Sequence, residues 1–151
     1  NVVVPDIIVF SFMFEDFTRC VVDELHYVQQ SLWKGRMAEA LAAFQPVVEQ
    51  YRAMPAKPPV SEEQRKYIVQ ANAMTQQKEF AKALALYEKA LAMDPASYPA
   101  AYYNMALIAA QQGNYHRAIL NMRKYLLLAP QAEDARSAQD KIYEWQARVG
   151  E

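Results

Sequence analysis

The sequence predicts an all-α fold, an α-solenoid of stacked helical hairpins that ends in a C-terminal capping helix. The first observation is a repeat, because the segment 80–95 is answered by the segment 115–130, and Ala118 lies 35 positions after Ala83. A period of this length is typical of stacked pairs of helices. The second observation is composition, since the chain has only three glycines, whereas alanine and leucine, which favour helices, are common.

Length and charge narrow the classes of function. The 151 residues can form one domain or a short solenoid with a buried core. The 16 basic and 17 acidic residues give a formal net charge of −1. This balance offers no electrostatic footprint for nucleic acid or for an anionic membrane surface. We therefore expect no nucleic acid among the partners.

The cysteine content and the first residue bear on compartment and processing. Cys20 is the single cysteine, so the chain can form neither an intrachain disulfide nor a thiolate metal cluster. A lone thiol fits a reducing compartment slightly better, which favours the cytoplasm; a periplasmic or envelope-anchored location applies if a signal precedes residue 1. Because the chain starts at Asn1 and not at Met, we expect it to derive from a longer protein.

Residues 1–14 form an apolar lead. Their β-branched and aromatic residues lack helical periodicity and predict an extended or strand-like segment. This lead would be the end of a preceding domain, a cover for an apolar face of the helices, or a contact for a membrane or a second copy of the chain. The run 7–14 is shorter than the roughly 20 residues of a membrane-spanning helix. We expect no spanning segment, and homo-oligomerisation through the lead is an alternative role.

Residues 15–54 predict a divergent helical hairpin. Its first helix has four apolar residues on one face, at i, i+4, i+7 and i+11: Val21, Leu25, Val28 and Leu32. Gly35 is predicted to end this helix, and the second helix carries Phe44 on its apolar stripe. Pro46 should kink or shorten that second helix. Three prolines then mark residues 55–60 as a loop.

Residues 61–130 predict two further hairpins, and residues 131–149 predict the capping helix. The Ser-x-x-Gln pattern of Ser61 and Gln64 predicts a capping box, in which each side chain bonds the backbone N–H of the other residue. The end of a stacked array needs one apolar and one charged face. The last helix provides them, and its apolar face comprises Ala138, Ile142, Trp145 and Val149.

The two hairpins of residues 61–130 resemble tetratricopeptide repeats, which are helix–turn–helix units of about 34 residues. With Gln64 at position 1, the first unit matches the family pattern at Tyr67, Ala71, Ala83, Tyr87, Ala90 and Pro95. With Pro99 at position 1, the second unit has Tyr102, Met105, Ala106, Ala118, Met122, Tyr125 and Pro130 at the pattern positions. The resemblance implies a right-handed α-solenoid in which small residues let neighbouring helices approach closely.

The first unit departs from the family pattern at two positions and the second at one. Gln70 replaces a large apolar residue, and Lys78 replaces the turn glycine that the second unit supplies as Gly113. Tyr125 is bulky where alanine is usual. This tyrosine should hold the capping helix further from the second hairpin.

The resemblance also implies a binding groove lined by the first helix of each unit. The residues at the groove positions are Arg65, Ile68, Asn72, Gln76, Tyr103, Asn104, Leu107 and Gln111. The capping helix could add Asp134, Ser137 and Lys141. Such a mixture of amides and apolar side chains suits an extended peptide or a partner helix. The alternative is that Asn72 and Asn104 only bond neighbouring helices.

A specialised branch of the family captures the C-terminal carboxylate of chaperones with asparagines and cations. The present chain has Asn72 and Asn104 at the asparagine positions, but the three cation positions hold Ile68, Asp134 and Ala138. Because a free carboxylate needs charge-assisted donors, we predict that this chain is not a carboxylate-clamp chaperone adaptor.

The sequence contains no motif that predicts an enzyme. His26 and His116 are the only histidines. His26 has no other histidine or cysteine at i+3 or i+4 to bind a metal with it, and His116 is expected on a solvent-facing surface. There is no glycine-rich phosphate loop or nucleophile elbow, so we expect no cofactor and no metal. The predicted function is a protein–protein interaction scaffold whose partner is another protein or a peptide. The alternatives are a self-assembly module and an accessory domain of a larger bacterial envelope protein or enzyme.

Overall fold

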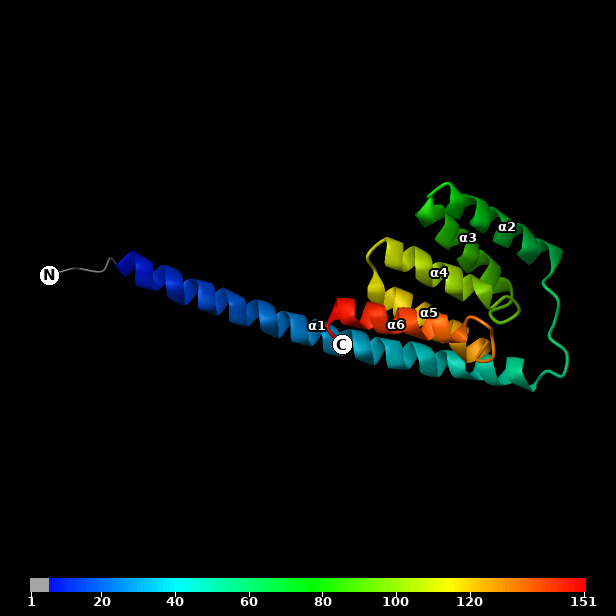
Figure 1. The fold of residues 1–151 in the computed structure, drawn as a ribbon, viewed down its shortest axis with the longest axis horizontal. Coiled ribbons are helices and arrows are strands. Elements are labelled where there is room, and N and C mark those ends of the chain that lie inside the picture. Colours follow the sequence, from blue (N-terminus) through cyan, green and yellow to red (C-terminus); the bar gives the residue numbers. More distant parts are fainter. Residues whose placement is uncertain (1–5) are drawn as a thin grey trace. The chain divides into compact units, whose positions relative to one another are not determined.

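The computed structural model describes the backbone of residues 6–151 and the side chains of residues 18–19, 21, 24–25 and 28–151. The described chain is helical and contains no strand, which confirms the all-α prediction. Figure 1 shows the helices in order: α1 (Asp6–Ala53), α2 (Glu62–Gln76), α3 (Phe80–Met93), α4 (Ala100–Gln111), α5 (Tyr115–Leu128) and α6 (Ala135–Val149).

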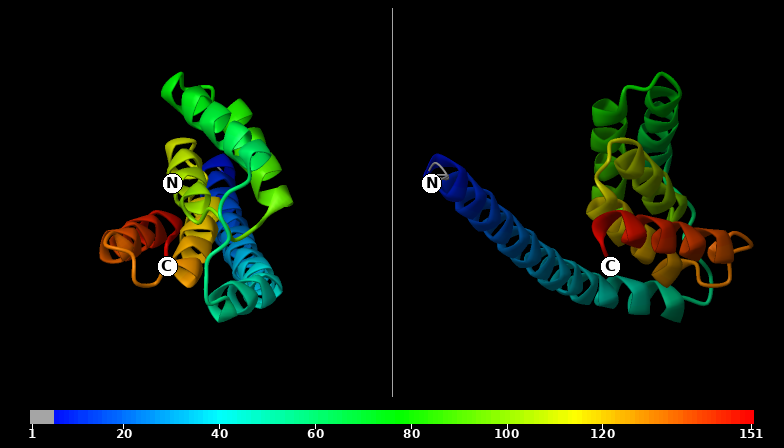
Figure 2. Two further views of the ribbon diagram at one scale, coloured as in Figure 1. Left: turned by 90° about the vertical axis from the view of Figure 1, so that its right-hand side faces the viewer. Right: turned by 60° about the vertical axis from the view of Figure 1, so that its left-hand side comes forward.

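The chain divides into two units, Asn1–Glu39 and Ala40–Glu151. Their boundary falls inside α1. The second unit contains the repeats. In it, α2 packs on α3, α4 packs on α5, and α6 packs on α5. The two hairpins are turned relative to one another (Figure 2), as expected for a solenoid.

Small residues explain why the helices of each hairpin pack closely. Ala71 of α2 and Ala83 of α3 are fully buried, and so are Ala106 of α4 and Ala118 of α5. A side chain of one carbon lets two helix backbones approach without leaving a void, and burial of larger neighbours then fills the core. These positions were placed by the repeat pattern, and their burial supports that register. Ala71 and Ala83 form one core cluster with Leu84, Tyr87, Ala101, Met105 and Ile108.

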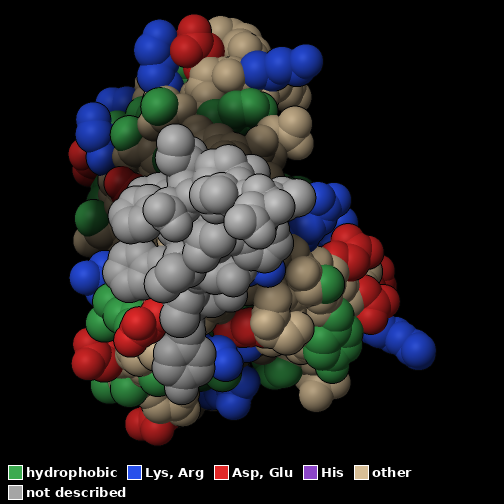
Figure 3. Space-filling view, turned by 90° about the vertical axis from the view of Figure 1, so that its left-hand side faces the viewer, with side chains coloured by type: hydrophobic (Ala, Val, Ile, Leu, Met, Phe, Trp, Pro, Cys, Tyr) green, Lys and Arg blue, Asp and Glu red, His purple; other side chains and the backbone are tan. Residues whose placement is uncertain are grey.

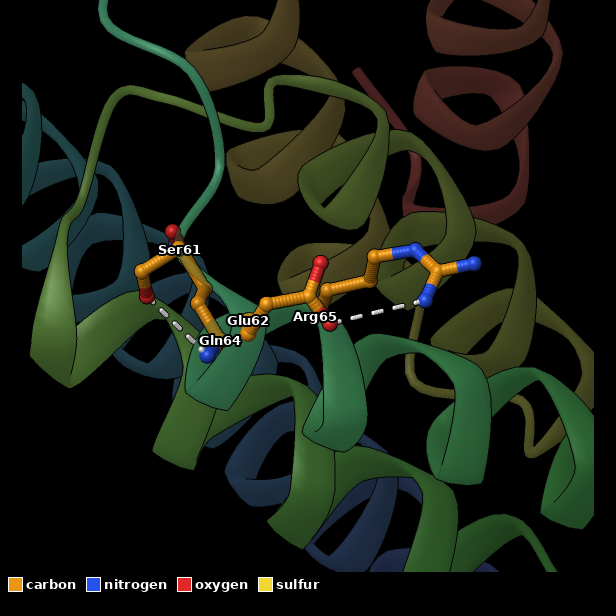
Figure 4. A network of polar contacts seen from close by, with 4 residues as sticks. All are labelled: Ser61, Glu62, Gln64 and Arg65. Atoms are coloured by element: carbon orange, nitrogen blue, oxygen red, sulfur yellow. Dashed lines mark hydrogen bonds and ion pairs between the residues drawn. The ribbon is translucent and has the colours of Figure 1, made fainter.

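The start of α2 differs from the predicted capping box in one of its two bonds. The Ser61 Oγ accepts a hydrogen bond from the backbone N–H of Gln64 at 3.2 Å, as predicted (Figure 4). The Gln64 side chain does not return to Ser61. Its amide nitrogen donates to the carbonyl oxygens of Ala90 and Asp94, each at 3.0 Å. Its amide oxygen accepts from the Ser97 hydroxyl at 2.9 Å. Gln64 therefore joins the first hairpin to the loop that follows it.

The prediction of a strand-like lead is wrong for residues 6–14, which belong to α1. Each β-branched residue lowers helix stability by less than about 1 kcal/mol relative to alanine. A helix that already exists over the following residues gains one hydrogen bond per added residue, so the helix extends through the apolar run. Residues 1–5 of the lead lie outside the described residues.

The prediction of a divergent hairpin over residues 15–54 is also wrong, because α1 is one helix through this segment. Gly35 does not end it. An internal glycine costs only about 1 kcal/mol, and no Ser, Thr, Asp or Asn follows Gly35 closely to cap a new helix. The helix also continues past Pro46. The apolar stripe of Val21, Leu25, Val28 and Leu32 is exposed.

The last turns of α1 belong to the second unit and pack against its second hairpin. Phe44 and Val48 are buried, and the Phe44 ring meets the Tyr102 ring edge-on at a centroid distance of 5.3 Å. The Arg52 Nη2 donates to the carbonyl oxygen of Leu127 at 2.6 Å. The apolar stripe predicted around Phe44 is therefore a packing face. The predicted partner helix in residues 15–39 does not exist as a separate helix, because these residues belong to α1. The predicted loop 55–60 has no helix.

Candidate functional site

A pocket of about 440 Å³ lies between α2, α3 and α4. We call it the amide pocket, because four of its lining residues carry side-chain amides. Its lining comprises Asn72, Thr75, Gln76, Phe80, Tyr87, Asn104, Leu107, Ile108 and Gln111. Five of the eight predicted groove residues meet here. They come from the first helix of each hairpin, as the repeat pattern predicts.

The two asparagines of the amide pocket are joined through Tyr87. The Tyr87 hydroxyl donates to Asn72 Oδ1 at 2.5 Å, and Asn104 Nδ2 donates to the same hydroxyl at 3.2 Å. Three helices thereby share one hydrogen-bonded chain. Burial raises the pKa of Tyr87, so its hydroxyl stays protonated at neutral pH. The alternative that the asparagines bond neighbouring helices is thus observed, although each amide uses only one of its polar atoms.

A second pocket of about 690 Å³ adjoins the first, since Leu107 and Gln111 line both. We call it the cap pocket, because α6 supplies most of its wall. The remaining lining residues are Ala110, Tyr115, Lys141, Glu144, Trp145, Ala147 and Arg148. Lys141 was predicted from the capping helix, and it does line this pocket. The Arg148 guanidinium lies 5.9 Å from the centroid of the Tyr115 ring, a distance at which a cation and an aromatic face attract each other.

Three of the predicted groove residues line neither pocket. Arg65 is exposed and pairs with Glu62 at 3.7 Å (Figure 4). The prediction that Ile68 offers its side chain to a ligand is wrong, because only 5% of Ile68 is exposed. Tyr103 meets the Tyr125 ring edge-on at 5.2 Å and packs inside the second hairpin.

The other two predicted residues of the capping helix also lie outside the pockets. Asp134 accepts a hydrogen bond from the Tyr125 hydroxyl at 2.5 Å. Burial and this bond raise the pKa of Tyr125 to about 12. The bulky tyrosine at this position therefore bonds the residue that precedes α6. Ser137 is exposed and lines neither pocket.

Sequence reasoning missed the second-helix side of the amide pocket. Phe80 and Tyr87 come from α3, which the family pattern treats as a packing helix. One signal was present: position 24 holds Tyr87 in the first unit and Met122 in the second. A hydroxyl in a buried position needs a partner, and the polar residues nearby in the groove were the candidates.

The electrostatics of the two pockets differ. No charged residue is among those that line the amide pocket, whereas Lys141, Glu144 and Arg148 line the cap pocket. On the face shown in Figure 3, acidic and basic side chains are interspersed over the described residues. Within this described part, no cluster of His, Cys, Asp and Glu could hold a metal ion. None of its helices is apolar over a length that would cross a membrane.

The fold and the pockets define an array of helical hairpins with a polar pocket lined by its first helices. The family model named Tetratricopeptide repeat matches residues 70–142, from α2 into α6. The segment 70–142 therefore matches tetratricopeptide repeats, which confirms the resemblance drawn from the sequence. No curated protein and no solved structure matches the chain. Repeats of this family are generally non-catalytic modules for protein–protein interaction.

Proposed function

We propose that the unit Ala40–Glu151 is an interaction scaffold that binds an extended peptide or a partner helix in the groove formed by the amide pocket and the cap pocket. The observation that carries this proposal is the convergence of the predicted groove residues. Asn72 and Gln76 from α2 line the same pocket as Asn104, Leu107 and Gln111 from α4. Gln76 and Gln111 are exposed, so the packing of the hairpins does not require their amides.

The groove offers both kinds of contact that a bound peptide needs. Leu107 lies where the two pockets meet and is 38% exposed, so it can bury an apolar side chain of a ligand. The exposed amides of Gln76 and Gln111 can bond a peptide backbone. Lys141 and Arg148 give the cap pocket two cations against one acidic residue, Glu144. An apolar residue followed by an acidic one would fit this arrangement.

The groove is not a carboxylate clamp. The position of the first clamp lysine holds Ile68, which is buried, and a second cation position holds Ala138, which is also buried. The third holds Asp134, whose carboxylate is bonded to Tyr125. A terminal carboxylate would find no charge-assisted donor at these positions. We expect a C-terminal amide to change the affinity of a bound peptide by less than about twofold.

Selection from a displayed library of random peptides tests the groove. The double variant Leu107→Ala, Gln111→Ala removes one apolar and one amide side chain shared by the two pockets. The matched control, Tyr143→Ala with Gln131→Ala, removes one exposed aromatic and one exposed amide elsewhere. We expect selected peptides to lose at least about tenfold in affinity with the first variant and nothing with the control. Equal binding by both variants, with helicity unchanged by circular dichroism, would contradict the groove assignment.

A second candidate function is self-association through the unit Asn1–Glu39. Its exposed stripe has apolar residues spaced four, three and four positions apart, the spacing of a coiled-coil seam: Val21, Leu25, Val28 and Leu32. The positions beside this seam are Glu24, Gln29, Ser31 and Arg36. In a parallel pair of copies, Glu24 would meet Gln29 and Ser31 would meet Arg36, so no like charges oppose each other. The side chains of the lead, residues 1–14, lie outside the described ones.

Light scattering tests self-association directly. We expect the chain to have the mass of a dimer, and Leu25→Ser with Leu32→Ser to convert it to a monomer. The control variant, Lys34→Ser with Ala38→Ser, changes exposed residues of the same helix off the stripe and should leave the dimer intact. A monomeric wild-type chain, or a dimer that survives the double leucine change, would refute this candidate.

A further inference from the structure

The hydrogen bonds around Tyr87 give the amide pocket a direction, because they determine which polar atom of Asn72 and of Asn104 remains for a ligand. A phenol has one proton, and this hydroxyl donates it to Asn72 Oδ1 at 2.5 Å. The hydroxyl must therefore act as an acceptor toward Asn104, whose Nδ2 donates to it at 3.2 Å. Only 1% of Tyr87 is exposed, so water competes little for these bonds. The single buried proton therefore couples the two amides, because one of them must present its oxygen to the hydroxyl and the other its nitrogen.

This direction leaves one donor and one acceptor for a ligand. Asn72 uses its oxygen on Tyr87, so its Nδ2 group remains as a donor. Asn104 uses its nitrogen on Tyr87, so its Oδ1 remains as an acceptor. No further hydrogen bond of these two atoms occurs among the described residues, and both asparagines line the amide pocket. The pocket thus shows a donor on its α2 side and an acceptor on its α4 side.

We propose that Tyr87 is a positioning residue that makes the amide pocket select the N–H and C=O of an extended peptide and reject a carboxylate. This inference rests on the proposed function and names the ligand class of the same groove. In an extended chain the N–H and C=O of one residue point to the same side. That residue would accept from Asn72 through its C=O and donate to Asn104 through its N–H.

The same arrangement of one donor and one acceptor excludes a partner helix and a carboxylate as ligands of the amide pocket. The backbone groups of a helix are already bonded within the helix, so a partner helix cannot use this pair. A carboxylate has only acceptor oxygens, and one of them would face the lone pairs of Asn104 Oδ1. No charged residue lines the amide pocket to offset that repulsion. Of the two ligands proposed for the groove, an extended internal segment of a peptide therefore fits the amide pocket and a partner helix does not.

Small probes test the direction of the pocket without a known partner. N-methylacetamide has both an N–H and a C=O, N,N-dimethylacetamide lacks the N–H, and acetate is a carboxylate. Each is titrated at constant ionic strength while the side-chain amide signals of Asn72 and Asn104 are followed by nuclear magnetic resonance. In the wild-type chain we expect N-methylacetamide to bind about tenfold more tightly than either other probe. Equal shifts with acetate would overturn the proposal.

The variant Tyr87→Phe tests the positioning role. Removal of the hydroxyl frees both amides to turn, so we expect the preference for N-methylacetamide over acetate to fall to within about twofold. The control Tyr143→Phe removes an exposed hydroxyl on α6 and should preserve the preference. A preference that survives in a folded Tyr87→Phe chain would also overturn the proposal. If this variant does not fold, the wild-type comparison of the three probes decides alone.

The two proposals fail in different ways. If library peptides bind and depend on Leu107 and Gln111, but acetate binds the amide pocket as well as N-methylacetamide does, the scaffold function stands and the role of Tyr87 is wrong. If the probes show the expected preference but the library peptides do not depend on Leu107 and Gln111, the groove assignment is wrong and the local direction of the amides stands.

Discussion

The two hairpins share a fold but differ in the side chain at position 24 of the repeat. In the α2–α3 hairpin, the buried residues Gln64 and Tyr87 use their polar atoms to bond neighbouring helices and the following loop. In the α4–α5 hairpin, position 24 holds Met122, and Met122 and Ile119 are fully buried without any polar bond from their side chains. The comparison teaches that the small buried residues determine how closely the helices pack. A position that holds a large residue, such as position 24, can have either an apolar or a hydrogen-bonding side chain.

The turns of the two hairpins make a second contrast. Lys78 has a φ of 60° and Gly113 has a φ of 76°. Both residues occupy the same place between the first and second helix of their hairpins. A left-handed conformation costs a residue with a Cβ about 1 kcal/mol, and glycine avoids this cost. The first hairpin therefore keeps a strained turn that the second does not have.

The largest expected effect comes from position 24 of the α4–α5 hairpin. Met122→Ala should lower the free energy of unfolding by about 2–5 kcal/mol, because it removes a fully buried side chain and leaves a cavity. Met93→Ala, at a residue that is 42% exposed, is the matched control and should cost far less. Urea denaturation followed by circular dichroism measures both. Equal losses would mean that the α4–α5 hairpin does not depend on apolar packing at this position.

The hydrogen bonds of Gln64 in the α2–α3 hairpin should contribute less than the packing of Met122. Gln64→Ala leaves the Ser97 hydroxyl and the carbonyl oxygens of Ala90 and Asp94 without the Gln64 amide. A lost buried partner costs about 1–3 kcal/mol, and we expect a decrease in the free energy of unfolding in that range. Gln70→Ala changes an exposed glutamine on the same helix and should be neutral within about 0.5 kcal/mol. A neutral Gln64→Ala variant would contradict the polar account of this hairpin.

Exchange of the two turn residues should shift stability in opposite directions. Lys78→Gly relieves the strained turn and should stabilise the chain by about 1 kcal/mol. Gly113→Ala should destabilise it by a similar amount. A Cβ at Gly113 meets nothing within 4 Å, so the cost would come from the backbone alone. The same sign for both changes in a denaturation experiment would show that the turns are not equivalent.

The repeat pattern predicted those parts of the fold that depend on local packing rules. Ala71, Ala83 and Ala118 were placed by the register of the repeat pattern and are fully buried. The pattern failed in α1, where Gly35 was read as a helix end. A glycine ends a helix when it adopts the left-handed conformation of a C-terminal cap. Gly113 and Gly150 have a positive φ, whereas Gly35 does not. Whether a glycine is tolerated depends on the packing around it, which a single sequence does not display.

The candidate site was predictable to the extent that it follows the repeat register. The repeat positions identified the residues of α2 and α4 that line the amide pocket. The same positions also identified Ile68 and Tyr103, which line no pocket, and the sequence could not distinguish the two groups. Both occupy groove positions by count, but Ile68 is buried and Tyr103 turns toward Tyr125. Side-chain direction depends on neighbours that are distant in sequence. The role of Tyr87 depends on atoms from three helices, so spacing along the chain could not show it.

The smallest expected effect concerns the ion pair that bridges the two hairpins. Arg117 Nη2 of α5 lies 2.6 Å from Glu88 Oε1 of α3, and the two side chains are 39% and 56% exposed. Because exposed pairs contribute about 0.2–1 kcal/mol, a double-mutant cycle with Glu88→Gln and Arg117→Gln should give a coupling energy in that range. The pair Lys82–Glu79, at 3.7 Å between the first turn of α3 and the residue before it, is the matched control and should couple less. At about 1 M salt the Debye length is near 3 Å, so the coupling should become smaller. A coupling that does not change with salt would mean that the two hairpins are joined here by packing of the side chains and not by their charges.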